Sequence, residues 1–91
     1  LRAADALRIG TIGRLSTIVG LPRAATTDEV ADAVAEVAGR DRAALLLLLV
    51  DEHPRSDREL IDLSDRLAEL ERVTAAAASP DHPRSTGRME P

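Results

Sequence analysis

The densest group of chemically active side chains in the sequence is the run Asp51-Glu52-His53. Two carboxylates beside an imidazole could bind a metal ion or transfer protons. A metal site would need further ligands, and the second histidine of the chain, His82, lies near the C-terminus. No metal-binding motif has this spacing. We therefore interpret the run as a polar loop that ends a helix, and we predict no metal ligands.

The remaining acids and hydroxyls form no catalytic pattern either. An acid pair such as Glu69 with Glu71 would lie on the polar face of a helix beside arginines, where carboxylates stay ionised. Ser56 and the other serines lack the Gly-x-Ser-x-Gly context of an activated nucleophile. The sequence has no glycine-rich phosphate loop between a strand and a helix. We expect no catalytic residues, no cofactor and a protein that is not an enzyme.

Composition limits the classes of partner. The 91 residues allow one domain at most, and the net charge of −4 argues against a surface for nucleic acid or anionic membrane. The absence of cysteine removes disulfides, thiolate catalysis and cysteine-based zinc sites. Because the chain has no Phe, Tyr or Trp, each buried contact covers little area and close helix packing must compensate.

The sequence is organised around the run Ala-Ala-Leu-Leu-Leu-Leu-Leu-Val at residues 43–50. A helix without a polar side must be enclosed. The run is too short to cross a membrane, which takes about 20 apolar residues. We therefore predict a central helix from residue 42 to about 50, capped by Asp41 and enclosed by the rest of a small helical domain.

Three further helices are predicted around this centre. The first covers residues 1–20 and ends at Gly20, and the second covers 27–38, with a capping box formed by Thr26 and Glu29. The last covers about 57–77 and repeats the capping box with Ser56 and Glu59. The apolar face of the first helix comprises Leu1, Ala4, Leu7, Ile12, Leu15, Ile18 and Val19.

The last helix carries a seam of leucines at alternating steps of three and four residues, namely Leu60, Leu63, Leu67 and Leu70. About two heptads are too few for a stable intermolecular coiled coil, so we expect the seam to pack inside the domain. A weak homodimer through residues 70–77 is the alternative. On the polar faces, Asp62 and Arg66 are spaced as an i,i+4 ion pair.

The predicted fold is all-α: a compact array of four helices with a central Leu-rich helix. The domain should span residues 1–78, and the Pro-rich stretch 79–91 is predicted to be a disordered C-terminal tail. Because the chain begins at Leu1, we expect it to be part of a longer protein.

Three residues are candidate contacts for a protein partner: Ile9, Leu70 and Val73. Ile9 points away from the apolar face of the first helix, and it lies beside Gly10, one of two glycines that weaken this helix. Leu70 and Val73 lie in the distal part of the last helix. A helix-turn-helix DNA-binding module is a weaker alternative, since its second helix would present leucines to base edges.

Four segments carry a resemblance to a known family. They are Arg-Leu-Ser-Thr-Ile-Val-Gly-Leu-Pro-Arg (14–23), Ala-Thr-Thr-Asp-Glu-Val-Ala-Asp-Ala-Val-Ala (25–35), Gly-Arg-Asp (39–41) and Ser-Asp-Arg-Glu-Leu-Ile-Asp-Leu-Ser-Asp-Arg-Leu-Ala-Glu-Leu-Glu (56–71). Together they resemble the C-terminal cytosolic segment of an uncharacterised actinobacterial membrane-protein family. Its members carry a glutamine-amidotransferase-like domain of unknown function and tend to be encoded near MoxR-type AAA+ ATPases. The chain departs from the family at 51–55, where a Gly/Pro-rich link is usual.

The resemblance covers about residues 1–73 and implies a cytosol-facing interaction domain of a membrane protein. It implies that the chain lies on the cytoplasmic side, with membrane contact only through other parts of the parent. The implied partner is a MoxR-type AAA+ ATPase or another protein encoded nearby, and no nucleic acid. A purely structural tail domain without a partner is the competing expectation.

Overall fold

The fold of residues 3–79, the part that the computed structural model describes, is all-α. Its helices are α1 (Ala3–Ile18), α2 (Thr27–Ala38), α3 (Arg42–Leu46) and α4 (Asp57–Ala78), and α3 continues directly into a π-helical turn, η1 (Leu47–Asp51). The predicted four-helix array is confirmed. Residues 80–91 of the predicted tail lie outside the described residues.

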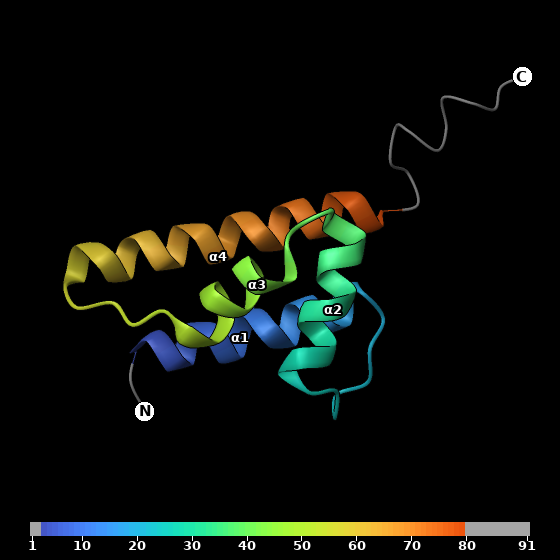
Figure 1. Ribbon diagram of the computed structural model, residues 1–91, viewed down its shortest axis with the longest axis horizontal. Helices are drawn as coiled ribbons and strands as arrows, with labels where there is room; N and C mark the ends of the chain where they lie inside the picture. Colours follow the sequence, from blue (N-terminus) through green and yellow to red (C-terminus); the bar gives the residue numbers. More distant parts are fainter. Residues whose placement is uncertain (1–2, 80–91) are drawn as a thin grey trace, which may run out of the picture.

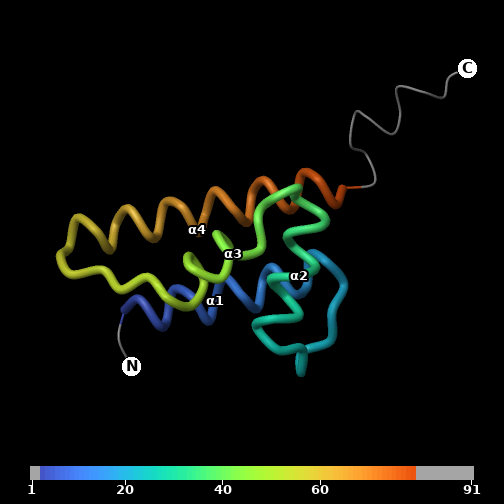
Figure 2. Tube along the Cα trace, viewed as in Figure 1, coloured from blue at the N-terminus to red at the C-terminus, as the bar shows by residue number. Residues whose placement is uncertain are grey.

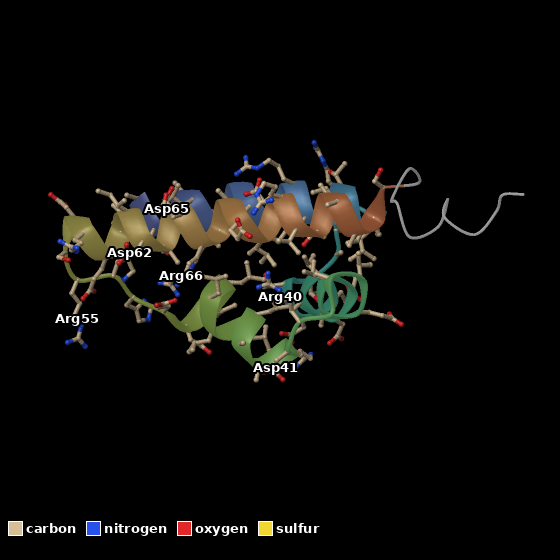
Figure 3. The ribbon with its side chains drawn as sticks, turned by 90° about the horizontal axis from the view of Figure 1, so that it is seen from above. Arg40, Asp41, Arg55, Asp62, Asp65 and Arg66 are labelled. Atoms are coloured by element: carbon tan, nitrogen blue, oxygen red, sulfur yellow. The ribbon has the colours of Figure 1, made fainter. Side chains whose placement is uncertain are left out.

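The long helices α1 and α4 form one layer of the fold and run side by side in the same direction (Figure 1). The α3–η1 segment runs in the opposite direction, and η1 contacts both long helices (Figure 2). Figure 3 shows α2 and α3 together on one side of the α1–α4 pair. The opposite side of this pair is not covered by any other helix of residues 3–79.

Every helix contributes aliphatic side chains to the core. The buried set is Leu15 of α1, Val30, Ala31 and Val34 of α2, Leu45 of α3, Leu49 of η1, and Leu63, Leu67 and Leu70 of α4. The leucine seam of α4 therefore packs inside the domain, as expected. It extends to Thr74, which is fully buried.

The leucine-rich run is central but not enclosed, which corrects the sequence-based prediction. Leu47 is 54% exposed and Val50 is 46% exposed, whereas Leu45 and Leu49 are buried. The reason is that α3–η1 lies across the α1–α4 pair as an outer layer, so that only one side of it meets other helices. Burial at an i,i+4 spacing is what a helix with one covered side shows.

The predicted N-terminal caps are mostly confirmed. Thr26 and Glu29 form the complete capping box of α2, and Asp41 accepts a hydrogen bond of 3.0 Å from the Ala44 N–H. The cap of α4 differs. Ser56 accepts from the Glu59 N–H as predicted, but the Glu59 carboxylate accepts from the Arg55 N–H, one residue before the position expected in a capping box.

Two glycines end the first two helices in the left-handed conformation. Gly20 has a φ of 78° and Gly39 a φ of 67°, values that residues with a Cβ seldom adopt. After α1, the Leu21 N–H donates to the Ser16 carbonyl and the Gly20 N–H to the Thr17 carbonyl, the hydrogen-bond pattern of a Schellman motif. Gly39 starts the short link of residues 39–41 from α2 to α3, whereas Gly20 lies in the longer connection of residues 19–26 from α1 to α2.

The end of η1 is held by a buried arginine that the apolar pattern does not reveal. Arg8 of α1 is 6% exposed, and its Nε donates to the Leu48 carbonyl at 3.1 Å, while its Nη2 donates to the Glu52 carbonyl. The last carbonyls of a helix have no partner within the helix. Arg8 thus satisfies carbonyls at the C-terminal end of η1 and ties it to α1.

Candidate functional site

The run Asp51-Glu52-His53 has a structural role in the region where η1 ends. The Glu52 carboxylate accepts two hydrogen bonds from Arg66 of α4, at 2.8 and 2.7 Å. These bonds lower the pKa of Glu52 below its usual value, although partial burial opposes the effect. His53 is exposed. The run therefore connects η1 to α4 rather than presenting an acid and a base to a substrate.

Arg66 also corrects the predicted ion pair within α4. The sequence spacing suggested Asp62 as its partner, but the guanidinium fork binds Glu52 on both of its oxygens. Figure 3 shows Arg66 directed from α4 toward the chain that follows η1. A carboxylate that accepts from two guanidinium nitrogens at once matches the planar geometry of arginine, and Glu52 can do so. Asp62 contributes its nearby charge, which raises the pKa of Arg66 further.

A second polar cluster joins α1 to α4. Glu71 accepts a hydrogen bond of 2.6 Å from the buried Thr11 hydroxyl, and Arg14 Nε and Nη2 donate to its two oxygens at 2.7 and 3.1 Å. The bond from Arg14 is the main cause of the lowered pKa of Glu71, and partial burial opposes it. A general acid would need the opposite shift. This cluster therefore supports helix packing rather than proton transfer.

The described residues offer neither a metal site nor a membrane span. No group of three or more His, Asp or Glu side chains among residues 3–79 is placed to hold a metal ion. No helix in the same part of the chain is long and apolar enough to cross a bilayer.

A hollow of about 930 Å³ extends over the second half of α1, and we call it the α1 trough. Besides residues of α1, it is lined by residues of α4, of the loop before α2 and of α2 itself. The α1 backbone is uncovered at Gly13, while the Arg14 guanidinium lies over Gly10. The trough is lined by Ile9, Gly10, Ile12, Gly13, Arg14, Ser16, Thr17, Ile18, Leu21, Arg23, Ala25, Val30, Ala68, Glu71, Arg72 and Ala75.

A smaller apolar groove of about 590 Å³ adjoins the trough between the first halves of α1 and α4. Leu7, Leu60 and the exposed Ile61 line it, and Gly10 and Arg14 belong to both hollows. The two hollows therefore follow α1 along most of its length and meet at Gly10.

The three candidate contact residues have different environments. Ile9 is 62% exposed and lines the α1 trough, so it remains a candidate. Val73 is half-buried. Leu70 is 1% exposed and belongs to the core, so its assignment as a partner contact was wrong. The seam spacing that suggested Leu70 also places it on the face of α4 that packs against other helices of the domain.

Other surface residues of the trough were not identified from the sequence. Among them are Arg14, Arg23 and Arg72. The sequence indicated this surface only through the glycines near Ile9, because a glycine in the interior of a helix often has a packing or functional reason.

Comparison of the chain with protein-family models, with curated proteins and with solved structures finds no match. Function is therefore inferred from the sequence and from the geometry of the trough.

Proposed function

We propose that this chain is a non-enzymatic protein-interaction domain of a larger protein, with the α1 trough as its contact surface. The observation that carries the proposal is Gly13. A glycine inside a helix costs up to about 1 kcal/mol relative to alanine. The fold does not need this one, since a Cβ at residue 13 would meet nothing within 4 Å.

Close packing of a partner helix would explain why residue 13 is glycine. Helices pack at axial distances of about 8–10 Å, and the shortest distances require small residues at the contact. Gly13 provides such a contact, whereas the Arg14 guanidinium lies over Gly10, and Ala68 and Ala75 of α4 line the same trough. The exposed Ile9 at the same surface would gain burial on binding.

The resemblance of about residues 1–73 to the cytosolic end of an actinobacterial membrane-protein family supports a placement for this activity. In that setting the domain faces the cytoplasm and recruits a cytosolic protein, with a MoxR-type AAA+ ATPase or another protein encoded nearby as the first candidate. The proposal includes no catalytic role for the domain itself.

Site-specific photo-crosslinking tests the proposal. A photo-reactive amino acid replaces Ile9 in the chain produced in its native cells, and the matched control carries it at Glu36, which is exposed on α2 outside the trough. We expect a discrete adduct with another protein from position 9 and none from position 36. A structural tail without a partner would give no adduct at either position, and that result would contradict the proposed function.

A further inference from the structure

The α1 trough is basic on an acidic protein. The chain carries a net charge of −4, yet Arg14, Arg23 and Arg72 line the trough and Glu71 is the one carboxylate among its lining residues. Two of these arginines are paired, Arg14 with Glu71 and Arg72 with Glu69.

Arg23 is the arginine that leaves this surface with unbalanced charge. It makes no hydrogen bond or ion pair with any of residues 3–79, and it lies in the loop between α1 and α2. The side chains of Arg14 and Arg72 are 60% and 70% exposed, so both could also bind an incoming carboxylate. A partner with acidic groups would meet three guanidinium groups around an apolar strip.

The dimensions of the surface fit a helix. The two adjoining hollows follow α1 from Ala3 to Ile18. At 1.5 Å per residue, 16 helical residues span roughly 24 Å. A partner helix of about four turns would cover Gly13 with its apolar face and place its flanking side chains near the arginines, including Arg14, whose guanidinium lies over Gly10.

We propose, building on the interaction function proposed above, that the partner of the α1 trough is an amphipathic helix with acidic residues on both sides of its apolar face. The sign of the charge selects this occupant over a second copy of the chain. A twofold dimer would place one trough against another. The one carboxylate that lines each trough, Glu71, is already paired with Arg14, so Arg23 would gain no acidic partner and two basic surfaces would meet. An acidic helix meets the opposite sign.

Two synthetic peptides of 16 residues test the charge rule on the complete 91-residue chain. Both carry leucine and alanine on one helical face, and the flanking positions are glutamate in one peptide and arginine in the other. We expect saturable binding of the acidic peptide, followed by fluorescence anisotropy of a label on the peptide, and at least tenfold weaker binding of the basic one. Equal affinities, or no binding of either peptide, would overturn the inference.

Substitutions at Gly13 test the location. Alanine and glutamine both favour a helix over glycine, so Gly13→Ala and Gly13→Gln should each fold at least as stably as the parent chain. Only the glutamine side chain is long enough to fill the trough. We expect Gly13→Gln to weaken binding of the acidic peptide at least tenfold, and Gly13→Ala, whose methyl group takes up less of the space, to weaken it about threefold. Unchanged binding to Gly13→Gln would place the peptide elsewhere and overturn the inference.

The substitution Arg23→Gln tests the charge preference, and sedimentation of the free chain tests whether the trough binds a second copy. Arg23→Gln should reduce the preference for the acidic peptide severalfold, and an unaltered preference would count against the charge rule. A dimer of the free chain that Gly13→Gln dissociates would identify a second copy as the occupant instead. A cross-link from Ile9 to another protein, together with peptides bound without regard to charge, would retain the proposed function and reject this inference alone.

Discussion

Arg8 is the single residue whose removal should most weaken the attachment of η1. Its buried guanidinium donates to the carbonyls of Leu48 and Glu52. An alanine would leave both carbonyls without these donors, and hydrogen bonds from charged groups contribute about 1.5–3 kcal/mol each. We expect Arg8→Ala to lower the free energy of unfolding by about 2 kcal/mol or more, measured by urea unfolding with circular dichroism at 222 nm.

The matched control for Arg8 is Arg58, an exposed arginine in the first turn of α4. Arg58→Ala removes the same side chain from a helix without uncovering a buried carbonyl. Its effect should stay within about 0.5 kcal/mol. Equal losses of unfolding free energy in the two variants would show that Arg8 acts as a surface charge and not as a hydrogen-bond donor to the end of η1.

Thr74 offers a stabilising substitution. Its hydroxyl is fully buried and makes no hydrogen bond with the described residues. Valine has the same shape without a polar group, and leaving a buried hydroxyl unsatisfied costs about 1–3 kcal/mol. Thr74→Val should raise the free energy of unfolding by about 1 kcal/mol, seen as a higher urea midpoint. Thr74→Ser keeps the hydroxyl and loses a methyl group, so a gain in that variant would be inconsistent with this explanation.

At the residue scale, the sequence predicted local features well and long-range polar contacts poorly. Thr26, Asp41 and Ser56 were identified as helix caps because a cap depends on a partner three residues away. Arg8 and Glu52 meet their partners across 40 or more residues and 14 residues, respectively. No periodicity in the chain reports such pairings.

At the element scale, the contact between α1 and α4 depends on the ionisation of Glu71. Its folded-state pKa lies below its unfolded value, so this contact adds stability above the unfolded pKa and loses it as the pH falls through the folded pKa. Glu52 follows the same rule because Arg66 lowers its pKa. Urea midpoints should therefore drop between pH 7 and about pH 3.

Glu71→Gln isolates the α1–α4 share of this pH dependence. The amide cannot ionise, so the variant should have a lower midpoint at neutral pH and a smaller drop on acidification. Glu69→Gln is the control, since Glu69 pairs with Arg72 on the same helix and is half-exposed. A drop in Glu71→Gln as large as that of the parent chain would exclude Glu71 as a source of the acid sensitivity.

The leucine-rich segment shows where element-scale reasoning reached its limit. The prediction of a central helix was confirmed, while full enclosure was not, because residues 47–51 form a π turn on the outer layer. A run of leucines indicates that a helix buries apolar surface, but it does not show how many sides of that helix the other helices cover. Within residues 3–79, the other helices cover one side of this segment and leave Leu47 and Val50 exposed.

For the whole molecule, the arrangement of helices follows from capping, short turns and the leucine seam, all of which the sequence showed. The α1 trough combines α1, the loop after it and α4, so its outline required the three-dimensional fold. Only Ile9 and its neighbouring glycines pointed to this surface beforehand. A domain of this size gains only about 3–5 kcal/mol from its core, which makes an open apolar trough costly unless a partner covers it.

Leu47 and Val50 form a second exposed apolar surface, on α3–η1, that could bind a partner instead of the α1 trough. The most direct measurement therefore distinguishes these two surfaces. The measurement is a nuclear magnetic resonance titration of the isotope-labelled 91-residue chain with the acidic helical peptide. The account predicts that the amide signals of Gly10, Gly13 and Arg23 shift and saturate together while those of Leu47 and Val50 stay in place. Shifts confined to Leu47 and Val50 would contradict the central claim, because they would place the contact surface on α3–η1 and not on the α1 trough.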